Sequence, residues 1–300
     1  MTSASGYAAT ARAWVDRWDR QQETFLPERE AQFTALVDVV EETAGRPDPL
    51  VVDLGCGPGS IGVRLLRRIP AATVVSVDAD PLLIELGRAA YAGTEGLRFA
   101  DVDLRDPDWA AALGLDRQPD AVLSTTALHW LAPDVLASLY GGLTTLLRPG
   151  GILVNCDELE RDRTASPVLS RLDRALLTRE RARRARPDAA DSWYGWWQEV
   201  QAEPAFAAAV AERTRRGYDG ENHSDLSAAF AVHLEALQKA GFAEVGTLWQ
   251  RGEVRLLCAV THSPDNAAAF DEPHTHNHAP TTPTGHDTST DAPGPGAAGA

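Results

Sequence analysis

The chain has 300 residues, 43 acidic against 28 basic side chains, and a formal net charge of −15 at pH 7. A chain of this length can bury a sizeable core as one large domain or two small ones. The acidic balance argues against a nonspecific nucleic-acid binder, which normally carries a basic surface. No apolar stretch approaches the roughly 20 residues needed to span a bilayer.

The cysteine pattern and the first residues bear on the compartment. Cys56, Cys156 and Cys258 are odd in number and far apart, and no C-x-x-C occurs, so they predict reduced thiols and no metal site. Residues 1–6 have neither the basic region nor the apolar core of a secretory signal. We therefore expect a cytoplasmic protein.

Residues 1–46 are expected to form an N-terminal helical cap. Trp14 and Trp18 stand at i, i+4 in a helical pattern, and Pro27 is a natural start for a second helix that continues to Gly45. Packing of this helix pair on a sheet is the most common outcome for such tryptophans.

The next stretch joins an apolar run to a glycine-rich loop. Residues 50–54 read as a strand buried on both faces, and Gly55-Cys56-Gly57-Pro58-Gly59 follows before a helical pattern begins at Ser60. Glycines remove the Cβ atoms that would hold a ligand away from the backbone, and the N–H groups of the new helix face the same cavity. Strand, loop and helix together predict a ligand cradle.

Two templates fit these glycines. Residues 57–62 satisfy the dinucleotide spacing G-x-G-x-x-G, and Asp78 follows at about the expected 20 residues. Residues 53–59, Asp-Leu-Gly-Cys-Gly-Pro-Gly, resemble instead motif I of the class I S-adenosylmethionine-dependent methyltransferases. Asp53 favours the second template, because its carboxylate would oppose a pyrophosphate but attract an ammonium and a sulfonium.

Strands and helices then alternate. Strands are predicted at 73–77, 97–102, 120–124 and 151–156, with helices at 82–91 and 133–147. This alternation predicts a parallel, doubly wound α/β sheet, whose ligands bind outside the carboxyl ends of the strands beside the first one. Asp53, Asp78, Asp103 and the segment 124–130 all fall at that edge.

We therefore expect residues 47–157 to form the cofactor-binding half of the domain. Residues 158–224 then interrupt the alternation of strands and helices. The interruption is rich in arginine and then aromatic at Trp193, Tyr194, Trp196 and Trp197, which predicts a helical substrate insertion or lid. Its arginines would suit an anionic acceptor, although such spacing is more often a solvated face. A helix and an antiparallel hairpin are expected in 225–261, and a disordered tail in 262–300.

From about Leu50 to Val260 the chain resembles a class I methyltransferase. The motifs that carry the resemblance are Val51–Gly57, Val77-Asp78-Ala79-Asp80, Asp103-Leu104 and Arg148-Pro149-Gly150-Gly151, and residues 120–131 resemble the small-molecule, trans-aconitate methyltransferase-like subgroup. The resemblance implies a seven-stranded, mostly parallel, Rossmann-like sheet that ends in an antiparallel hairpin.

The resemblance also implies S-adenosyl-L-methionine as the cofactor. Asp53 would lie near its ammonium, Asp78 would accept from both ribose hydroxyls, and Asp103 would accept from the adenine amino group, with Asp101 as the rival. The cofactor-binding residues expected in this way are Asp53, Gly55, Cys56, Gly57, Gly59, Asp78, Ala79, Asp103, Leu104 and Thr125.

Methyl transfer is an in-line displacement, and positioning of this kind can contribute roughly 7–11 kcal/mol. His129 is the candidate general base, because imidazole titrates near neutrality and this one follows the fourth strand. A histidine that merely hydrogen-bonds the loop backbone fits equally well. Trp130, Trp193, Trp197 and Trp14 are the candidate substrate-binding residues, and packing is an equal or commoner role for each.

We therefore expect a methyltransferase that acts on an oxygen or nitrogen of a small-molecule acceptor, with no nucleic-acid or membrane partner. One alternative is an NAD(P)-dependent oxidoreductase, against which Asp53 and the terminal hairpin count. Another is a catalytically silent S-adenosylmethionine-binding protein, which would have the same cofactor positions. The acceptor and the oligomeric state remain open.

Overall fold

The structure is a computed structural model that describes residues 4–26, 28–184, 192–218 and 229–264. The expected tail beyond residue 264 lies outside the described residues. So do residues 185–191 and 219–228, which belong to the expected insertion and to the start of the helix expected at 225–240.

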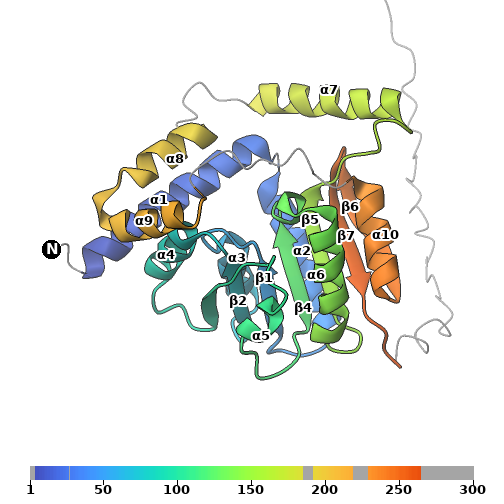
Figure 1. The fold of residues 1–300 in the computed structure, drawn as a ribbon, viewed down its shortest axis with the longest axis horizontal. Helices are drawn as coiled ribbons and strands as arrows, with labels where there is room; N and C mark the ends of the chain where they lie inside the picture. The colour runs from blue at the N-terminus through green and yellow to red at the C-terminus, as the bar shows by residue number, and fades with distance from the viewer. Residues whose placement is uncertain (1–3, 27, 185–191, 219–228, 265–300) are drawn as a thin grey trace, which may run out of the picture.

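A seven-stranded sheet forms the centre of the fold, in the order β3-β2-β1-β4-β5-β7-β6 (Figure 1). Strands β1 to β5 pair in parallel, and β7 is antiparallel to both of its neighbours, β5 and β6, so that six of the seven strands run in one direction. The strands are β1 (Leu50–Leu54), β2 (Thr73–Asp78), β3 (Leu97–Asp101), β4 (Ala121–Thr125), β5 (Ile152–Glu158), β6 (Glu244–Arg251) and β7 (Val254–Val260). This order confirms the expected fold class. The strand order changes direction between β1 and β4, which is where sheets of this kind bind their ligands.

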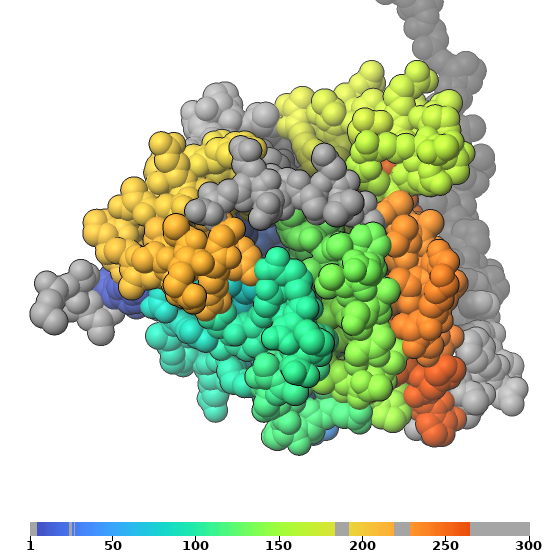
Figure 2. All heavy atoms as spheres, in the orientation of Figure 1, coloured from blue at the N-terminus to red at the C-terminus, as the bar shows by residue number. Residues whose placement is uncertain are grey.

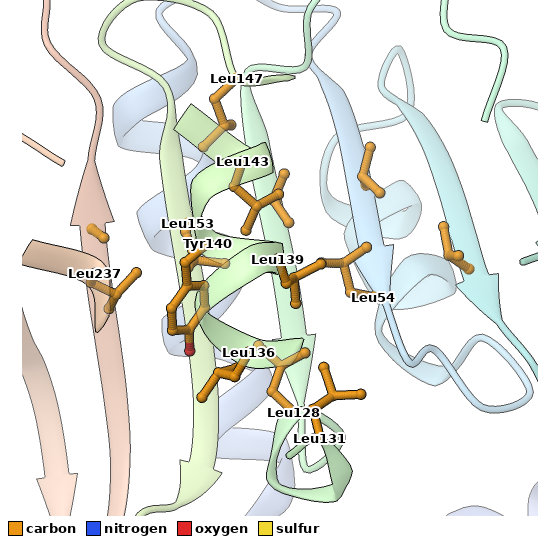
Figure 3. Close-up of a cluster of buried hydrophobic side chains, with 14 of the residues drawn as sticks. Leu54, Leu128, Leu131, Leu136, Leu139, Tyr140, Leu143, Leu147, Leu153 and Leu237 are labelled. Carbon is orange, nitrogen blue, oxygen red and sulfur yellow. The ribbon is translucent and has the colours of Figure 1, made fainter. Parts of the chain in front are cut away.

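One face of the sheet is covered by α6 (Pro133–Leu146) and α10 (Phe230–Ala240). Figure 3 shows Leu139 and Leu143 of α6 pointing onto the sheet, where they meet Leu54 of β1 and Leu153 of β5. Leu237 of α10 belongs to the same buried cluster. Because β1, β4 and β5 are buried on both faces, their sequences are largely apolar runs.

The other face is covered by α2 (Arg29–Ala44) and α3 (Ser60–Arg68). Phe33 and Leu36 of α2 pack with Leu65 of α3 against the remaining side chains of β1, β4 and β5. The second helix begins at Arg29, directly after Glu28, which adopts a left-handed conformation with φ of 67°. Pro27, the expected start of this helix, lies outside the described residues. It ends where expected, at Gly45, which is also left-handed.

Short helices and turns follow several of the strands. Asp80 caps α4 (Pro81–Ala90) by accepting hydrogen bonds from the backbone N–H groups of Leu82 and Leu83. α5 (Trp109–Ala112) follows β3, and a short 3-10 helix, η1 (Leu128–Trp130), follows β4. β6 and β7 are joined by a tight turn at Gly252, whose φ is 60°.

A third cluster at the side of the sheet joins α4 to α1 (Ala4–Phe25), α8 (Trp193–Gln201), η2 (Pro204–Phe206) and α9 (Ala207–Arg215). α7 (Pro167–Arg184), at the top of Figure 1, adds none of its described side chains to this cluster. α1 packs on α4 and α8 through Trp14, Trp18 and Trp196, so α1 and α2 do not pack on the sheet as a pair (Figure 1). In the part of the chain that the structure describes, no helix has the length and apolar character to cross a membrane.

Candidate active site

The carboxyl ends of β1 to β5 form one edge, and the predicted cofactor residues lie along it. The glycine loop after β1 contacts the segment after β4, since a Cβ atom on Gly55 would lie 2.2 Å from that of Ala127. It also contacts the end of β2, because the N–H of Gly57 donates to Asp78 Oδ2 over 2.8 Å. The structure therefore brings three distant sequence motifs together.

The glycines of the loop have separate reasons to be glycine. Gly55, Gly57 and Gly59 all have positive φ, at 67°, 55° and 89°. A Cβ atom on Gly59 would also lie 2.6 Å from the ring of Phe99. At Gly57 the nearest atom would be 3.5 Å away in the ring of Trp18, so that tryptophan lies over the loop. At Gly55 and Gly59, a side chain would therefore clash with a neighbour as well as strain the backbone.

Asp53 is completely buried, and neither carboxylate oxygen has a hydrogen-bond partner among the described residues. Burial, and then the charge of Asp78, raise the pKa of Asp53 to about 8. A buried ionisable group without a partner is unfavourable unless a ligand or counter-charge offsets it. The chemistry of this position fits the ammonium of a cationic cofactor.

Asp78 keeps hydrogen-bonding capacity for a ligand. Its Oδ2 accepts from Gly57 N–H, and its Oδ1 accepts from Asp80 N–H over 2.9 Å. Each oxygen retains a second lone pair, as a pair of ribose hydroxyls would require. Burial first, and then the charge of Asp80, raise the pKa of Asp78 to about 6, while its backbone hydrogen bonds oppose the shift.

The two candidates for the adenine acid both lie at this edge, and both are engaged. Asp103 accepts from Arg105 Nε at 2.9 Å and Nη2 at 2.7 Å, and from the hydroxyl of Tyr218 at 3.4 Å. Asp101 accepts from both Nη atoms of Arg216, at 2.6 and 2.8 Å. The geometry does not choose between them, and Leu104 packs partly into the core.

The smaller predicted cofactor residues line the same loops. The Cys56 thiol is buried, which raises its pKa well above the ordinary value. Ala79 offers its carbonyl to Arg216 Nη1 at 3.2 Å. Thr125 ends β4, and the next residue, Thr126, has φ of 50°, an uncommon conformation for a β-branched residue.

His129 forms a pair that the sequence did not predict. Its Nδ1 lies 2.8 Å from Asp157 Oδ1, and its backbone N–H donates to Asp157 Oδ2 over 3.3 Å. Burial lowers the pKa of His129, but the charge and hydrogen bond of the buried Asp157 outweigh it, so the pKa lies above its ordinary value. Asp157 lies next to the end of β5, and an acid at a strand end was the available signal for it.

The candidate tryptophans divide into two groups. Trp130 is 41% exposed, with its ring centroid 4.8 Å from that of His129, so it borders the pair. Trp193 and Trp197 are half-buried and contact Trp18, at 5.6 and 6.1 Å between ring centroids. Trp14 is nearly buried and packs against α8, which fits the packing role.

The sheet order, the glycine loop and the acidic edge agree with the fold and the site that the resemblance implies. Residues 51–151 match the family model described as a methyltransferase domain. The matched residues include the glycine loop, Asp78 and Asp103, which carry the resemblance to the class I S-adenosylmethionine-dependent methyltransferases. S-adenosyl-L-methionine is the cofactor of that class.

The most similar curated relatives include three trans-aconitate 2-methyltransferases. The chain is 38% identical over 104 residues to that of Methylobacterium radiotolerans, covering 35% of this chain and 36% of the relative. It is 34% identical over 128 residues to that of Streptomyces coelicolor, covering 42% and 39%. For Azoarcus sp. the identity is 35% over 136 residues, covering 45% and 49%. The match thus spans less than half the length of each relative.

One solved structure extends the likeness in fold over most of the chain. An O-methyltransferase family protein from Burkholderia thailandensis has a TM-score of 0.50 and 20% identity, covering 86% of this chain and 72% of its own. At this identity the likeness concerns the fold alone.

Proposed function

We propose that this protein transfers the methyl group of S-adenosyl-L-methionine to an oxygen or nitrogen of a small-molecule acceptor. The observation that carries the proposal is the His129–Asp157 pair, which stands at the strand edge where this class binds its methyl donor. A protein that only bound the cofactor would have no need of an oriented imidazole there.

The residues at the edge suit the cofactor's three parts. Asp53 would face the ammonium of the methionine portion, since its buried carboxylate lacks a partner among the described residues. Asp78 would accept from the ribose hydroxyls, and Asp103 from the adenine amino group. When bound, the sulfonium supplies a methyl group that is already reactive, so the protein chiefly has to align the nucleophile and exclude water.

His129 would accept the acceptor's proton. With Nδ1–H donated to Asp157, the other ring nitrogen, Nε2, carries the free lone pair. As the acceptor's oxygen or nitrogen attacks, its proton passes to Nε2, and the charge of Asp157 stabilises the resulting imidazolium. Trp130, against the imidazole, would shield this step from water.

The acceptor is the least defined part of the proposal. The names of the relatives make trans-aconitate the first acceptor to test, followed by other small carboxylic acids, phenols and amines. Trp193 and Trp197 of the insertion are the proposed acceptor-side wall, and the insertion as a whole, residues 158–224, is the proposed lid.

The proposal is tested by following labelled methyl transfer from S-adenosyl-L-methionine to that acceptor panel. His129→Ala should lower kcat by about 10²–10⁴-fold, the usual contribution of a general base, with cofactor affinity unchanged. His262→Ala is the matched control, because His262 is exposed near the opposite end of β5. Cofactor binding without methylation of any acceptor would favour the silent binding protein instead.

A further inference from the structure

The end of the insertion lies over the strand edge where the adenosine part of the cofactor is expected. α9 packs on α4, and Figure 2 shows its atoms seated against those of the β2–α4 region. The segment from Arg213 to Tyr218, which comprises the end of α9 and the following turn, reaches the carboxyl ends of β2 and β3. We call this segment the strap.

Two arginines fasten the strap to that edge. Arg213 Nε lies 2.7 Å from Asp80 Oδ2, and both side chains are nearly buried, at 12% and 11% exposure. Both Nη atoms of Arg216 donate hydrogen bonds to the Asp101 carboxylate, and Nη1 also donates to the carbonyl of Ala79. A bidentate arginine–carboxylate contact fixes direction as well as distance. The strap is therefore held at two successive strand ends.

The anchors do not engage Asp78, the proposed ribose acid. Asp78 is the last residue of β2 and pairs with Asp101 in the sheet, and its side chain accepts only backbone hydrogen bonds among the described residues. Tyr218, at the end of the strap, contacts the acid after β3, with its hydroxyl 2.7 Å from Arg105 Nη2 and 3.4 Å from Asp103 Oδ2. The strap therefore contacts Ala79, Asp80 and Asp101, the neighbours of Asp78, and does not bond to the Asp78 side chain.

We infer that the strap is a wall of the cofactor site, which Arg213 and Arg216 fasten over the adenosine end of the bound cofactor. This rests on the proposed cofactor site and adds residues of the insertion to it. Arg213 and Arg216 are positioning residues, because their partners Asp80 and Asp101 belong to the edge and not to the cofactor. Arg213 also lies 4.2 Å from the centre of the Trp197 ring, so the strap is joined to the proposed acceptor-side wall.

A fastened strap should act mainly on the rate at which the cofactor leaves. The partly exposed pair of Arg216 contributes modestly, so its loss should speed dissociation by up to about fivefold. Loss of the nearly buried pair of Arg213 as well should raise the effect to about tenfold or more. The association rate should change less, since most interface changes act on dissociation. High salt should speed dissociation from the wild type and act less on the double variant.

The test is stopped-flow tryptophan fluorescence with S-adenosylhomocysteine, using the tryptophans beside the strap as the probe. Arg213→Ala/Arg216→Ala and the milder Arg216→Ala are compared with the wild type. Arg215→Ala is the matched control, because Arg215 is 71% exposed and, among the described residues, pairs only with Glu212 of its own helix. Thermal unfolding of each variant establishes that it is folded.

Faster dissociation in the two strap variants and not in Arg215→Ala, with a raised KM for S-adenosyl-L-methionine and an unchanged KM for the acceptor, supports the inference. Dissociation from the double variant within twofold of the wild type overturns it, as does an equal effect of Arg215→Ala. A wild type that fails to bind S-adenosylhomocysteine overturns the proposed function itself, so the two failures are distinguishable.

Discussion

At the scale of single residues, the site contains carboxylates in opposite circumstances. Asp157 is buried but engaged, with its oxygens accepting from His129 and from the backbone. Asp53 is buried and has no hydrogen-bond partner among the described residues. The first arrangement orients a base, and the second is suited to a ligand that brings a positive charge.

Asp157→Asn tests the first arrangement. Deprotonated His129 is the active form, so kcat of the wild type should rise with pH through a pKa above the ordinary value of about 6.5. Removing the negative charge destabilises the imidazolium, so this limb of the pH profile should move to lower pH. Loss of the fixed tautomer should also reduce the maximal kcat, by about tenfold or more.

The measurement is kcat against pH from about 5.5 to 9, with an acceptor whose own pKa lies outside that range. Asp162→Asn, a change at an exposed carboxylate before α7, is the control. A pH limb at the same position in wild type and Asp157→Asn would contradict the role assigned to Asp157.

The sequence predicts part of this chemistry. Asp53, Asp78 and Asp103 can be found because each follows an apolar strand, and strand ends share one edge. Asp157 follows the same rule but had no motif to mark it. The ion pairs of Arg213 and Arg216 could not be predicted from the sequence, because their partners lie 133 and 115 positions away and no local pattern indicates such pairs.

At the scale of elements, α1 and α8 are joined by a tryptophan cluster. Trp196 is fully buried, with its ring centroid 4.9 Å from that of Trp18, and its Nε1–H donates to the carbonyl of Trp14. Trp193 and Trp197 flank it and remain half-buried. Trp196 therefore holds the insertion to the N-terminal helix, while Trp193 and Trp197 pack against Trp18 and stay partly exposed.

Trp196→Ala should lower the free energy of unfolding by about 3–5 kcal/mol, as expected for removing a buried aromatic side chain. Trp193→Ala should cost less than half as much, because that ring is partly exposed. The measurement is urea denaturation followed by circular dichroism. Equal losses in the two variants would contradict the division of roles within the cluster.

The elements themselves are largely predictable from local patterns. The strand ends agree with the structure within two residues, because apolar runs and turn residues mark them. The docking of α1 on α4 and α8 was not predicted, since an amphipathic helix indicates only that it packs and not on what. α5 was also missed, because four residues are too few for a periodic signal.

At the scale of the whole molecule, the buried carboxyl groups of Asp53 and Asp78 should lower the stability of the cofactor-free protein as pH rises. The pKa values of Asp53, about 8, and Asp78, about 6, lie above the ordinary carboxyl value of about 3.9. Between about pH 4 and 8 these groups bind more protons in the folded than in the unfolded protein. Their contribution to the free energy of unfolding therefore falls as pH rises through that window.

Asp53→Asn removes the larger of these effects. At pH 8.5 the variant should unfold at a temperature at least about 2–4 °C above the wild type, the shift expected for about 1 kcal/mol in a chain of this size. At pH 4 the two should differ much less. The measurement is calorimetric unfolding without cofactor at both pH values, and a variant that is less stable than the wild type at pH 8.5 would refute the account of Asp53.

The central claim is that the acidic edge of the sheet binds a methyl donor and not a dinucleotide. It is tested most directly by isothermal calorimetry of S-adenosylhomocysteine and NAD⁺ with the wild type, Asp78→Asn and the exposed control Asp116→Asn. We predict that the wild type and the control bind S-adenosylhomocysteine and not NAD⁺. Asp78→Asn should lose about 1.5–3 kcal/mol of binding, the contribution of a hydrogen bond to a charged group. Binding of NAD⁺ alone, or equal affinity of Asp78→Asn and the wild type for S-adenosylhomocysteine, would contradict the claim.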